Sequence, residues 1–198
     1  MVKIEFAHIV PYSMLKLAEK YSDMHLLLYH WAQQNEGYVN FMSKSRRYKI
    51  LDNSQYELRQ EIDYKDLIRY AKKMNVNEIV APDIMHQFRK TKKLIDNFIP
   101  LVPKYINDKK VKIQGVVCGR HILDLHNCFD WMHEHEHIDV IAISKHGCTS
   151  TNNDDHFAAR QRFFSSSYGT WKPIHFLGVN HFKDLDIWHV NEIKNLIK

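Results

Sequence analysis

Seven short apolar runs, separated by stretches with helical spacing, constrain the fold of this chain more than any other feature. Several of them, such as IVAPD, VIAIS and IHFLGV, are continuous rather than alternating. Continuous runs are typical of strands buried on both faces of a parallel sheet. The predicted strands are Ile4–Val10, His25–His30, Tyr48–Asp52, Glu78–Asp83, Val111–Cys118, Asp139–Ser144 and Ile174–Asn180.

Helical patterns fill the intervals between these runs. In DYKDLIRYAKKM, the apolar residues Leu67, Ile68, Ala71 and Met74 recur at helical spacing. They predict a helix over Asp63–Met74. The other predicted helices are Tyr12–Tyr21, Tyr38–Ser45, Phe88–Phe98, Leu123–His133, Asp154–Phe164 and Lys183–Ile197. Strands that alternate with helices indicate repeated right-handed crossovers and an α/β fold.

Two α/β architectures fit this alternation, an open doubly wound sheet and a (β/α) barrel. No GxGxxG motif follows the first run, which weighs against the dinucleotide-binding version of the open sheet. We therefore expect one TIM-barrel-like domain over residues 1–198, made of seven strand–helix units and left incomplete or open. Such a barrel would expose a strand edge, and we expect a homodimer to cover it.

The composition constrains the compartment and the kinds of partner that we expect for the protein. No run of about 18 apolar residues is present, and the alternating start MVKIEFAHIV lacks a secretion signal. These features predict a cytoplasmic protein with no membrane contact. The three cysteines, Cys118, Cys128 and Cys148, form no CxxC pair, so we expect free thiols and no metal site. The formal net charge of +5 is compatible with a polyanionic partner.

Polar residues follow the predicted strands at the carboxyl ends, where parallel α/β folds place their working groups. Asp52 and Asp83 end neighbouring strands. Charged groups are placed there mainly when they are paired or functional, and two carboxylates can divide acid and base roles. A helix N-cap is the alternative interpretation of Asp52. The other candidate substrate-binding residues are Asn53, Gln55, Cys118, Gly119, Arg120, Ser144, Lys145, His146, Gly178, Asn180 and His181.

Five motifs occur in order between about Ile50 and Asn180. They read ILDNSQYEL, EIVAPDIM, IQGVVCGR, IDVIAIS and IHFLGVN. In order, spacing and strand context they resemble the tRNA-guanine transglycosylase superfamily. The resemblance is closest to its short branch from phages and bacteria, which is linked to 7-deazaguanine modification of DNA. Each motif alone has low specificity, whereas the ordered set of five is fairly specific.

This resemblance implies a TIM barrel that exchanges guanine for a 7-deazaguanine base in DNA or tRNA, without a cofactor. A carboxylate attacks the anomeric carbon and a covalent intermediate forms, after the nucleotide has been turned out of any stack. By resemblance, Asp52 contacts the reacting base and acts as acid or base, and Asp83 reads the purine edge. Cys118 and Gly119 stand where the family has Gln-Gly, and Ser144 and Lys145 lie near the segment beneath the base.

The chain also departs from the family pattern. Asn53-Ser54 lacks the glycine that usually follows Asp-Asn, Cys118 replaces a base-binding glutamine, and we find no further strand that would supply the family's nucleophilic Asp. Three interpretations remain open. The protein exchanges bases with Asp52 or Asp83 as nucleophile, binds a purine base, nucleotide or nucleic acid without turnover, or hydrolyses another N-glycoside.

Basic residues flank several predicted elements and suit contacts with phosphates. The predicted phosphate contacts are Arg46, Arg47, Arg89, Lys90, Arg160 and Arg162. The histidines of the HEHEH sequence, His133, His135 and His137, fall at the end of a predicted helix and away from the expected site. We therefore do not assign them to a metal.

Overall fold

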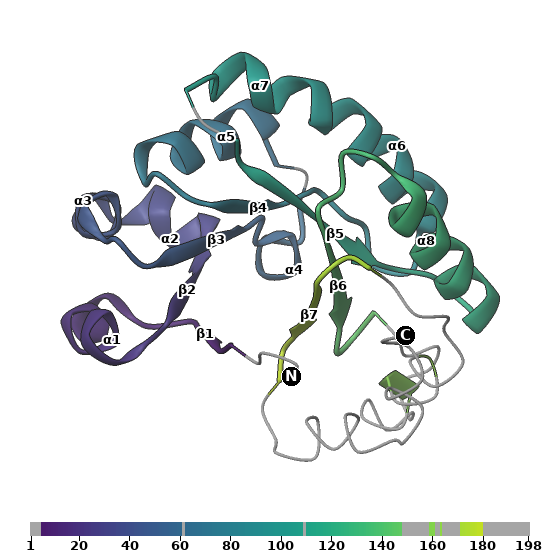
Figure 1. Cartoon of the computed structure of the whole chain (residues 1–198), viewed down its shortest axis with the longest axis horizontal. Helices are drawn as coiled ribbons and strands as arrows, with labels where there is room; N and C mark the ends of the chain where they lie inside the picture. Colours follow the sequence, from purple (N-terminus) through teal and green to yellow (C-terminus); the bar gives the residue numbers. More distant parts are fainter. Residues whose placement is uncertain are drawn as a thin grey trace. The chain divides into compact units, whose positions relative to one another are not determined.

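The computed structural model of the chain describes residues 5–60, 62–108, 110–147, 159–160, 163 and 171–179. Its strands run in the sheet order β1-β2-β3-β4-β5-β6-β7, and every described strand pairing is parallel (Figure 1). The strands are β1 (Ala7–His8), β2 (Met24–Leu28), β3 (Tyr48–Asp52), β4 (Glu78–Val80), β5 (Lys112–Val117), β6 (Val140–Ser144) and β7 (Ile174–Leu177).

The chain divides by its internal contacts into two compact units. The first comprises Met1–Pro82 and Asp96–Ile113, and the second comprises Asp83–Ile95 and Gln114–Lys198. The helices of the first unit are η1 (Tyr12–Met14), α1 (Leu15–Tyr21), α2 (Tyr29–Gln34), α3 (Glu36–Lys44), α4 (Gln55–Leu58), α5 (Tyr64–Lys73), η2 (Ile99–Leu101) and α7 (Val102–Tyr105). Helix α6 (Phe88–Phe98) begins in the second unit, which also contains α8 (Ile122–Glu134).

The core of the first unit follows directly from its apolar pattern. Leu27 of β2 pairs with Leu51 of β3, and both side chains are fully buried. Helix α5 begins where Asp63 accepts a hydrogen bond of 2.9 Å from the backbone N–H of Lys65, which satisfies a helix donor that would otherwise lack a partner. Its buried side chains include Leu67, one of the residues whose spacing predicts the helix.

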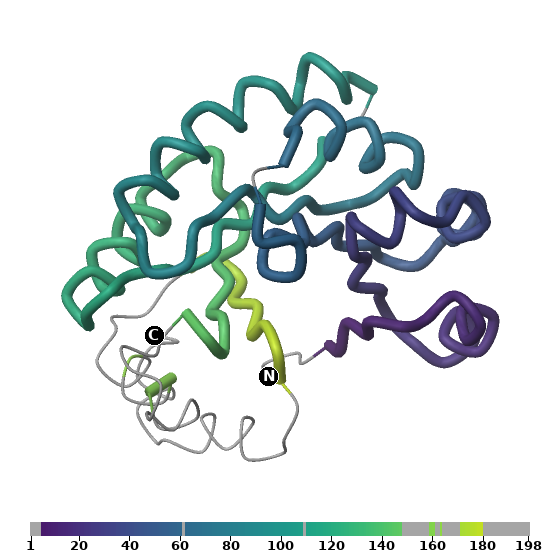
Figure 2. The backbone as a smooth tube through the Cα atoms, turned by 180° about the vertical axis from the view of Figure 1, so that it is seen from behind, coloured from purple at the N-terminus to yellow at the C-terminus, as the bar shows by residue number. Residues whose placement is uncertain are grey.

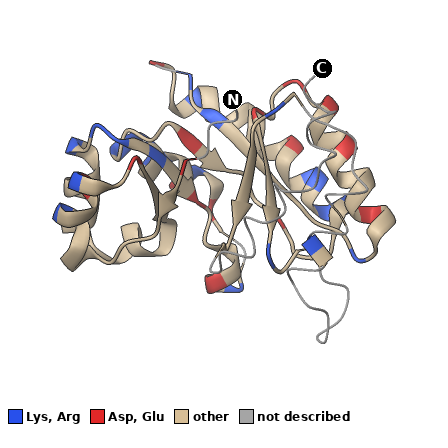
Figure 3. Cartoon of the chain, turned by 60° about the horizontal axis from the view of Figure 1, so that its bottom comes forward, with Lys and Arg blue, Asp and Glu red and all other residues tan. Residues whose placement is uncertain are grey.

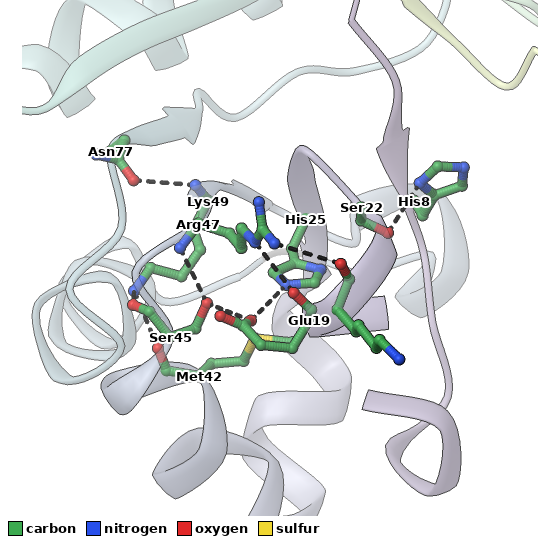
Figure 4. A network of polar contacts seen from close by, with 10 residues as sticks. His8, Glu19, Ser22, His25, Met42, Ser45, Arg47, Lys49 and Asn77 are labelled. Atoms are coloured by element: carbon green, nitrogen blue, oxygen red, sulfur yellow. Dashed lines mark hydrogen bonds and ion pairs between the residues drawn. The ribbon is translucent and has the colours of Figure 1, made fainter. Parts of the chain in front are cut away.

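A polar network surrounds the amino-terminal ends of β2 and β3 (Figure 4). The buried Lys49 donates hydrogen bonds of 2.9 Å to the carbonyl oxygens of Met42 and Ser45, at the carboxyl end of α3. Arg47 donates through Nε to the carbonyl oxygen of Glu19 near the end of α1. Cations at helix carboxyl ends satisfy carbonyls that lack intrahelical partners and complement the helix dipole.

The second unit contains the pairs β5–β6 and β6–β7, and the three strands lie side by side in both views (Figures 1 and 2). One face of this sheet is turned to α8. At Gly115 of β5 an added Cβ would lie only 2.9 Å from the sulfur of Met132. Lys172 donates to the carbonyl oxygens of Met132 and His135 and so caps the end of α8. Burial lowers the pKa of Lys172.

Most predicted elements overlap elements of the structure, whereas α2, α4, η2 and α7 are not among the predicted helices. The prediction of β3 and α6 is confirmed residue for residue, and the α/β class with parallel strands is confirmed. The prediction of strand structure for Tyr29 and His30 is wrong, because both residues lie in α2. The repeat units and the barrel stay predictions.

Some predicted segments fall outside the described residues. The helix predicted at 183–197 lies entirely outside them, and of the one predicted at 154–164 only residues 159, 160 and 163 are described, all helical. No helix in the described part of the chain is long and apolar enough to cross a membrane.

Candidate functional site

Asp52 ends β3 and begins a tight turn into α4. Its Oδ1 accepts a hydrogen bond of 2.6 Å from the backbone N–H of Ser54, and Asn53 Oδ1 accepts one of 2.8 Å from the N–H of Gln55. Ser54 has a left-handed backbone with φ of 55°. Two successive side-chain-to-backbone bonds of this kind fix a turn locally. The partly exposed Asp52 carboxylate is therefore held at the strand end.

The turn is tied to both neighbouring strands. Asn53 is 3% exposed and donates through Nδ2 to the carbonyl oxygen of Ala81, just after β4, at 2.8 Å. Ser54 Oγ accepts from the backbone N–H of His30, just after β2, at 3.4 Å. The carboxyl ends of β2, β3 and β4 are thus joined around Asp52 within the first unit. Asn53 supports the turn rather than facing a ligand.

Two buried polar atoms lie at these strand ends without hydrogen-bond partners among the described residues. They are Nδ1 of His30 and Oε1 of Gln55. Buried polar atoms are nearly always satisfied by protein, water or ligand. Gln55 was predicted as a site residue. His30 is not among the predicted site residues, although its place at the end of the apolar run HLLLYH is the signal that marks a polar residue at a strand end.

The turn after β4 is connected to the end of β5 in the second unit. Thr91 is fully buried; its Oγ1 accepts from the N–H of Ile84 at 2.8 Å and donates to the carbonyl oxygen of the same residue at 3.2 Å. The thiol of Cys118 donates to Thr91 Oγ1 at 3.1 Å. Cys118 is 1% exposed, so its side chain serves this internal contact. Burial raises the pKa of the neighbouring Cys128 thiol.

Gly119 and Arg120 follow Cys118 at the start of α8. A Cβ at Gly119 would lie 2.6 Å from the backbone nitrogen of Leu125, so only glycine fits there without movement. The carbonyl oxygen of Gly119 accepts a hydrogen bond of 3.2 Å from His86 Nδ1. Arg120 is exposed, and its backbone N–H donates to Asp124. Gly119 can therefore offer a ligand only its backbone.

The structure brings together the predicted residues at the ends of β6 and β7. Ser144 Oγ accepts hydrogen bonds from the N–H groups of His146 and Gly147, at 3.2 and 3.3 Å. The N–H of Lys145 donates to the carbonyl oxygen of Leu177 at 3.1 Å. Gly178 has φ of 71°, and a Cβ there would lie 3.3 Å from Lys145 Cβ. Asn180 and His181 lie outside the described residues.

The predicted phosphate contacts lie in different surroundings. Arg46 and Arg47 precede β3 and so lie at its amino-terminal end, whereas Asp52 lies at its carboxyl end. Arg47 donates to a carbonyl oxygen near the end of α1 and so caps that helix. Arg160 is fully buried and donates to the carbonyl oxygen of Leu177 at 2.9 Å. We assign neither Arg47 nor Arg160 to phosphate binding for these reasons. Arg162 lies outside the described residues.

Arg89 and Lys90 are different, because both are exposed in the first turn of α6. Lys92 and Lys93 follow them on the same helix and are also exposed. Figure 3 shows that much of the positive charge lies on helices. The first turn of α6 holds no acidic residue. Four cations at the amino-terminal half of a helix oppose its dipole, and an anionic partner would relieve this repulsion.

The HEHEH histidines pack against aromatic rings. His133 is stacked on Phe129 with ring centroids 6.4 Å apart, and His135 meets Trp131 edge-on at 5.0 Å. Within the described ranges, no group of three His, Cys, Asp or Glu side chains is placed to hold a metal ion.

No protein-family model and no curated protein matches this chain. The resemblance to the transglycosylase superfamily therefore rests on the ordered motifs.

Proposed function

We propose that this protein exchanges a purine base at an N-glycosidic bond of DNA or tRNA, replacing guanine with a 7-deazaguanine base. The observation that carries the proposal is the Asp52 turn. The carboxylate stands at the carboxyl end of a buried parallel strand, where α/β folds place catalytic groups, and its Oδ1 is oriented by the N–H of Ser54. The left-handed Ser54 supports the family comparison, because glycine, the usual residue there, favours this conformation.

The proposed reaction proceeds in two displacements. A carboxylate oxygen of Asp52 or Asp83 attacks the anomeric carbon, the carbon–nitrogen bond to guanine breaks, and guanine leaves with a proton. The incoming base then attacks the same carbon, loses its ring proton and releases the carboxylate. A carboxylate can also accept hydrogen bonds from the purine N1–H and amino group, which is the role that the resemblance implies for Asp83. His30 carries the proton in this proposal, because its buried Nδ1 has no hydrogen-bond partner among the described residues.

The experiment measures incorporation of labelled guanine and of a labelled 7-deazaguanine base into DNA and into tRNA. We expect wild type to incorporate label into one of the two polymers, and Asp52→Asn to lose at least 100-fold in rate, the lower range for removing a proton-transferring or nucleophilic group. Glu57→Gln, an exposed carboxylate three residues after Ser54, is the matched control and should retain the rate.

Thermal unfolding of both variants checks that they are folded. Asp83→Asn, tested in parallel, separates the roles of the two carboxylates: the nucleophile is the one whose removal abolishes the covalent adduct with the polymer. Incorporation by Asp52→Asn at the wild-type rate would refute a role for Asp52, and no incorporation by wild type into either polymer would refute base exchange.

One observation favours the second candidate function, which is binding of a purine base or nucleotide without turnover. The Cys118 thiol occupies the place of the family's base-binding glutamine, yet it is buried and donates to Thr91. A bound base would therefore lack the hydrogen bond that the family's glutamine provides. Wild type that binds a purine base in calorimetry but incorporates none into DNA or tRNA would establish this alternative.

A further inference from the structure

The helical stretch formed by η1 and α1 carries apolar side chains on two sides. Leu15 and Ala18 are buried and pack within the first unit. Met14, which ends η1, and Leu17 and Tyr21 of α1 follow one another at positions i, i+3 and i+7, so they lie along a second side. All three are exposed, and Tyr21 reaches 70%. One apolar side suffices to pack a helix on its own sheet, so the second side indicates a further contact.

Strand β1, which precedes this helical stretch, lies at the end of the sheet. It pairs with β2 along one edge, and no described strand pairs with its other edge. Both views show β1 and α1 side by side at this end of the first unit (Figures 1 and 2). Phe6 and Ile9, which flank β1, are also exposed. A strand edge bordered by apolar side chains is a typical place for contact with another chain.

The exposed apolar side chains of β1, η1, α1 and their flanks form what we call the β1–α1 surface. They are Phe6, Ile9, Tyr12, Met14, Leu17 and Tyr21. Side chains of this size bury about 150–250 Å² each, so a half-exposed set of this kind leaves on the order of 600 Å² of apolar surface. A monomer rarely exposes more than about 600 Å² in one patch. A stable interface buries about 800 Å² per partner, which this surface approaches before any polar rim is added.

We propose that the β1–α1 surface is the interface of a homodimer, so that its partner is a second copy of this chain. The stripe of Met14, Leu17 and Tyr21 is self-complementary, because it has one apolar residue about one turn to each side of Leu17. A two-fold axis through Leu17 sets the two copies of α1 antiparallel, with Met14 against the partner's Tyr21. The exposed Lys16 and Lys20 lie beside the stripe and form part of the solvated rim. This interface does not depend on base exchange.

Sedimentation velocity of the full chain over a series of concentrations measures the association. Wild type should have twice the mass of one chain at concentrations on the order of 10 µM. Leu17→Glu places two carboxylates opposite each other at the two-fold axis and should weaken dimerisation roughly 100-fold. The matched control, Leu123→Glu, makes the same change at an exposed leucine of α8 and should dimerise as wild type does. Thermal unfolding of both variants checks that they are folded.

A cysteine variant locates the contact without adding a charge. Leu17→Cys places one thiol of each protomer at the proposed axis, so oxidation by diamide should join the two thiols in a covalent dimer. Leu123→Cys and wild type, treated alike, measure linkage at other positions and should give less. A wild type that stays monomeric at about 100 µM would overturn the proposal and leave this surface to a different molecule. Equal association of Leu17→Glu and wild type, or equal linkage of Leu17→Cys and Leu123→Cys, would overturn it as well.

Discussion

The side-chain nitrogen of Asn53 donates a hydrogen bond of 2.8 Å to the carbonyl oxygen of Ala81. This bond joins the end of β3 to the residue after β4, and the same side chain accepts from the N–H of Gln55. Asn53 therefore holds the turn on which Asp52 stands. By comparison, the hydrogen bond from the N–H of His30 to Ser54 Oγ is longer, at 3.4 Å.

Replacing Asn53 with leucine should destabilise the protein. The substitution leaves the Ala81 carbonyl and the Gln55 N–H without their partner in a buried turn, at a cost of about 1–3 kcal/mol for each buried group that stays unpaired. Urea unfolding measures the difference. Glu57→Gln, on the exposed side of the same turn, should change the free energy of unfolding by less than about 0.5 kcal/mol. Equal stability of Asn53→Leu and wild type would contradict the assigned role.

Replacing Ser54 with glycine should preserve the stability of the protein, whereas replacing it with valine should lower it. At φ of 55° a side chain with a Cβ is strained by roughly 1–2 kcal/mol, and a β-branched one by more. Ser54→Gly relieves this strain but loses the weak contact with His30, so we expect a gain of at most about 1 kcal/mol. Ser54→Val should lose stability. Thermal unfolding of Ser54→Gly and Ser54→Val tests this expectation. A Ser54→Gly variant that is less stable than wild type would argue against backbone strain at Ser54.

Glu19 should contribute stability that disappears in acid. Burial raises the pKa of its carboxyl, but hydrogen bonds from Ser45 and His25 outweigh burial, and the pKa lies below its ordinary value of 4.5. The unfolded chain thus takes up this proton at a higher pH than the folded chain does. The stabilisation is full above about 4.5 and is lost as the pH falls through the lower folded value.

Glu19→Gln tests this pH dependence. The variant should be less stable than wild type by about 1 kcal/mol at pH 7, the net scale of one intramolecular hydrogen bond. The difference should shrink as the pH falls below 4.5. Urea unfolding between pH 3 and pH 7 measures it. A difference that stays constant over this range would show that the charge of Glu19 is not involved.

Lys49 should be essential for the end of α3. Lys49→Met keeps the aliphatic stem but removes both bonds to the carbonyl oxygens of Met42 and Ser45, which should cost about 2–4 kcal/mol. Lys44→Met, an exposed lysine in the last turn of α3, removes the same charge. It should cost less than about 1 kcal/mol. Similar losses for the two variants would show that charge alone explains the effect of Lys49.

Arg89 and Lys90 should contact phosphates if a nucleic acid binds at α6. The double variant Arg89→Gln/Lys90→Gln should weaken binding to DNA or tRNA and lower the slope of log affinity against log salt by about 2. Lys72→Gln/Lys73→Gln removes equal charge from the last turn of α5 and should leave the slope unchanged. Fluorescence anisotropy at several salt concentrations measures both. Equal slopes for the two double variants would refute a contact at α6.

The sequence by itself determined most of the strands and the longer helices, although not α2, α4 or α7, and it placed several polar residues at the strand ends. These properties depend on patterns of a few neighbouring residues, as β3 and α6 show, because burial on both faces requires an uninterrupted apolar run and a helix face repeats every three or four residues. Asp52 could be placed at a carboxyl end for the same reason.

Only the tertiary structure decided where the polar side chains at those positions point. The sequence predicts that Cys118 contacts the substrate, yet its thiol donates to Thr91. It predicts that Arg47 contacts a phosphate, yet Arg47 caps α1. Gln114 and His175 lie 61 residues apart in the chain and meet across β6. Such contacts join residues from different elements, and their partners are set by strand register and helix docking, which no local sequence pattern specifies.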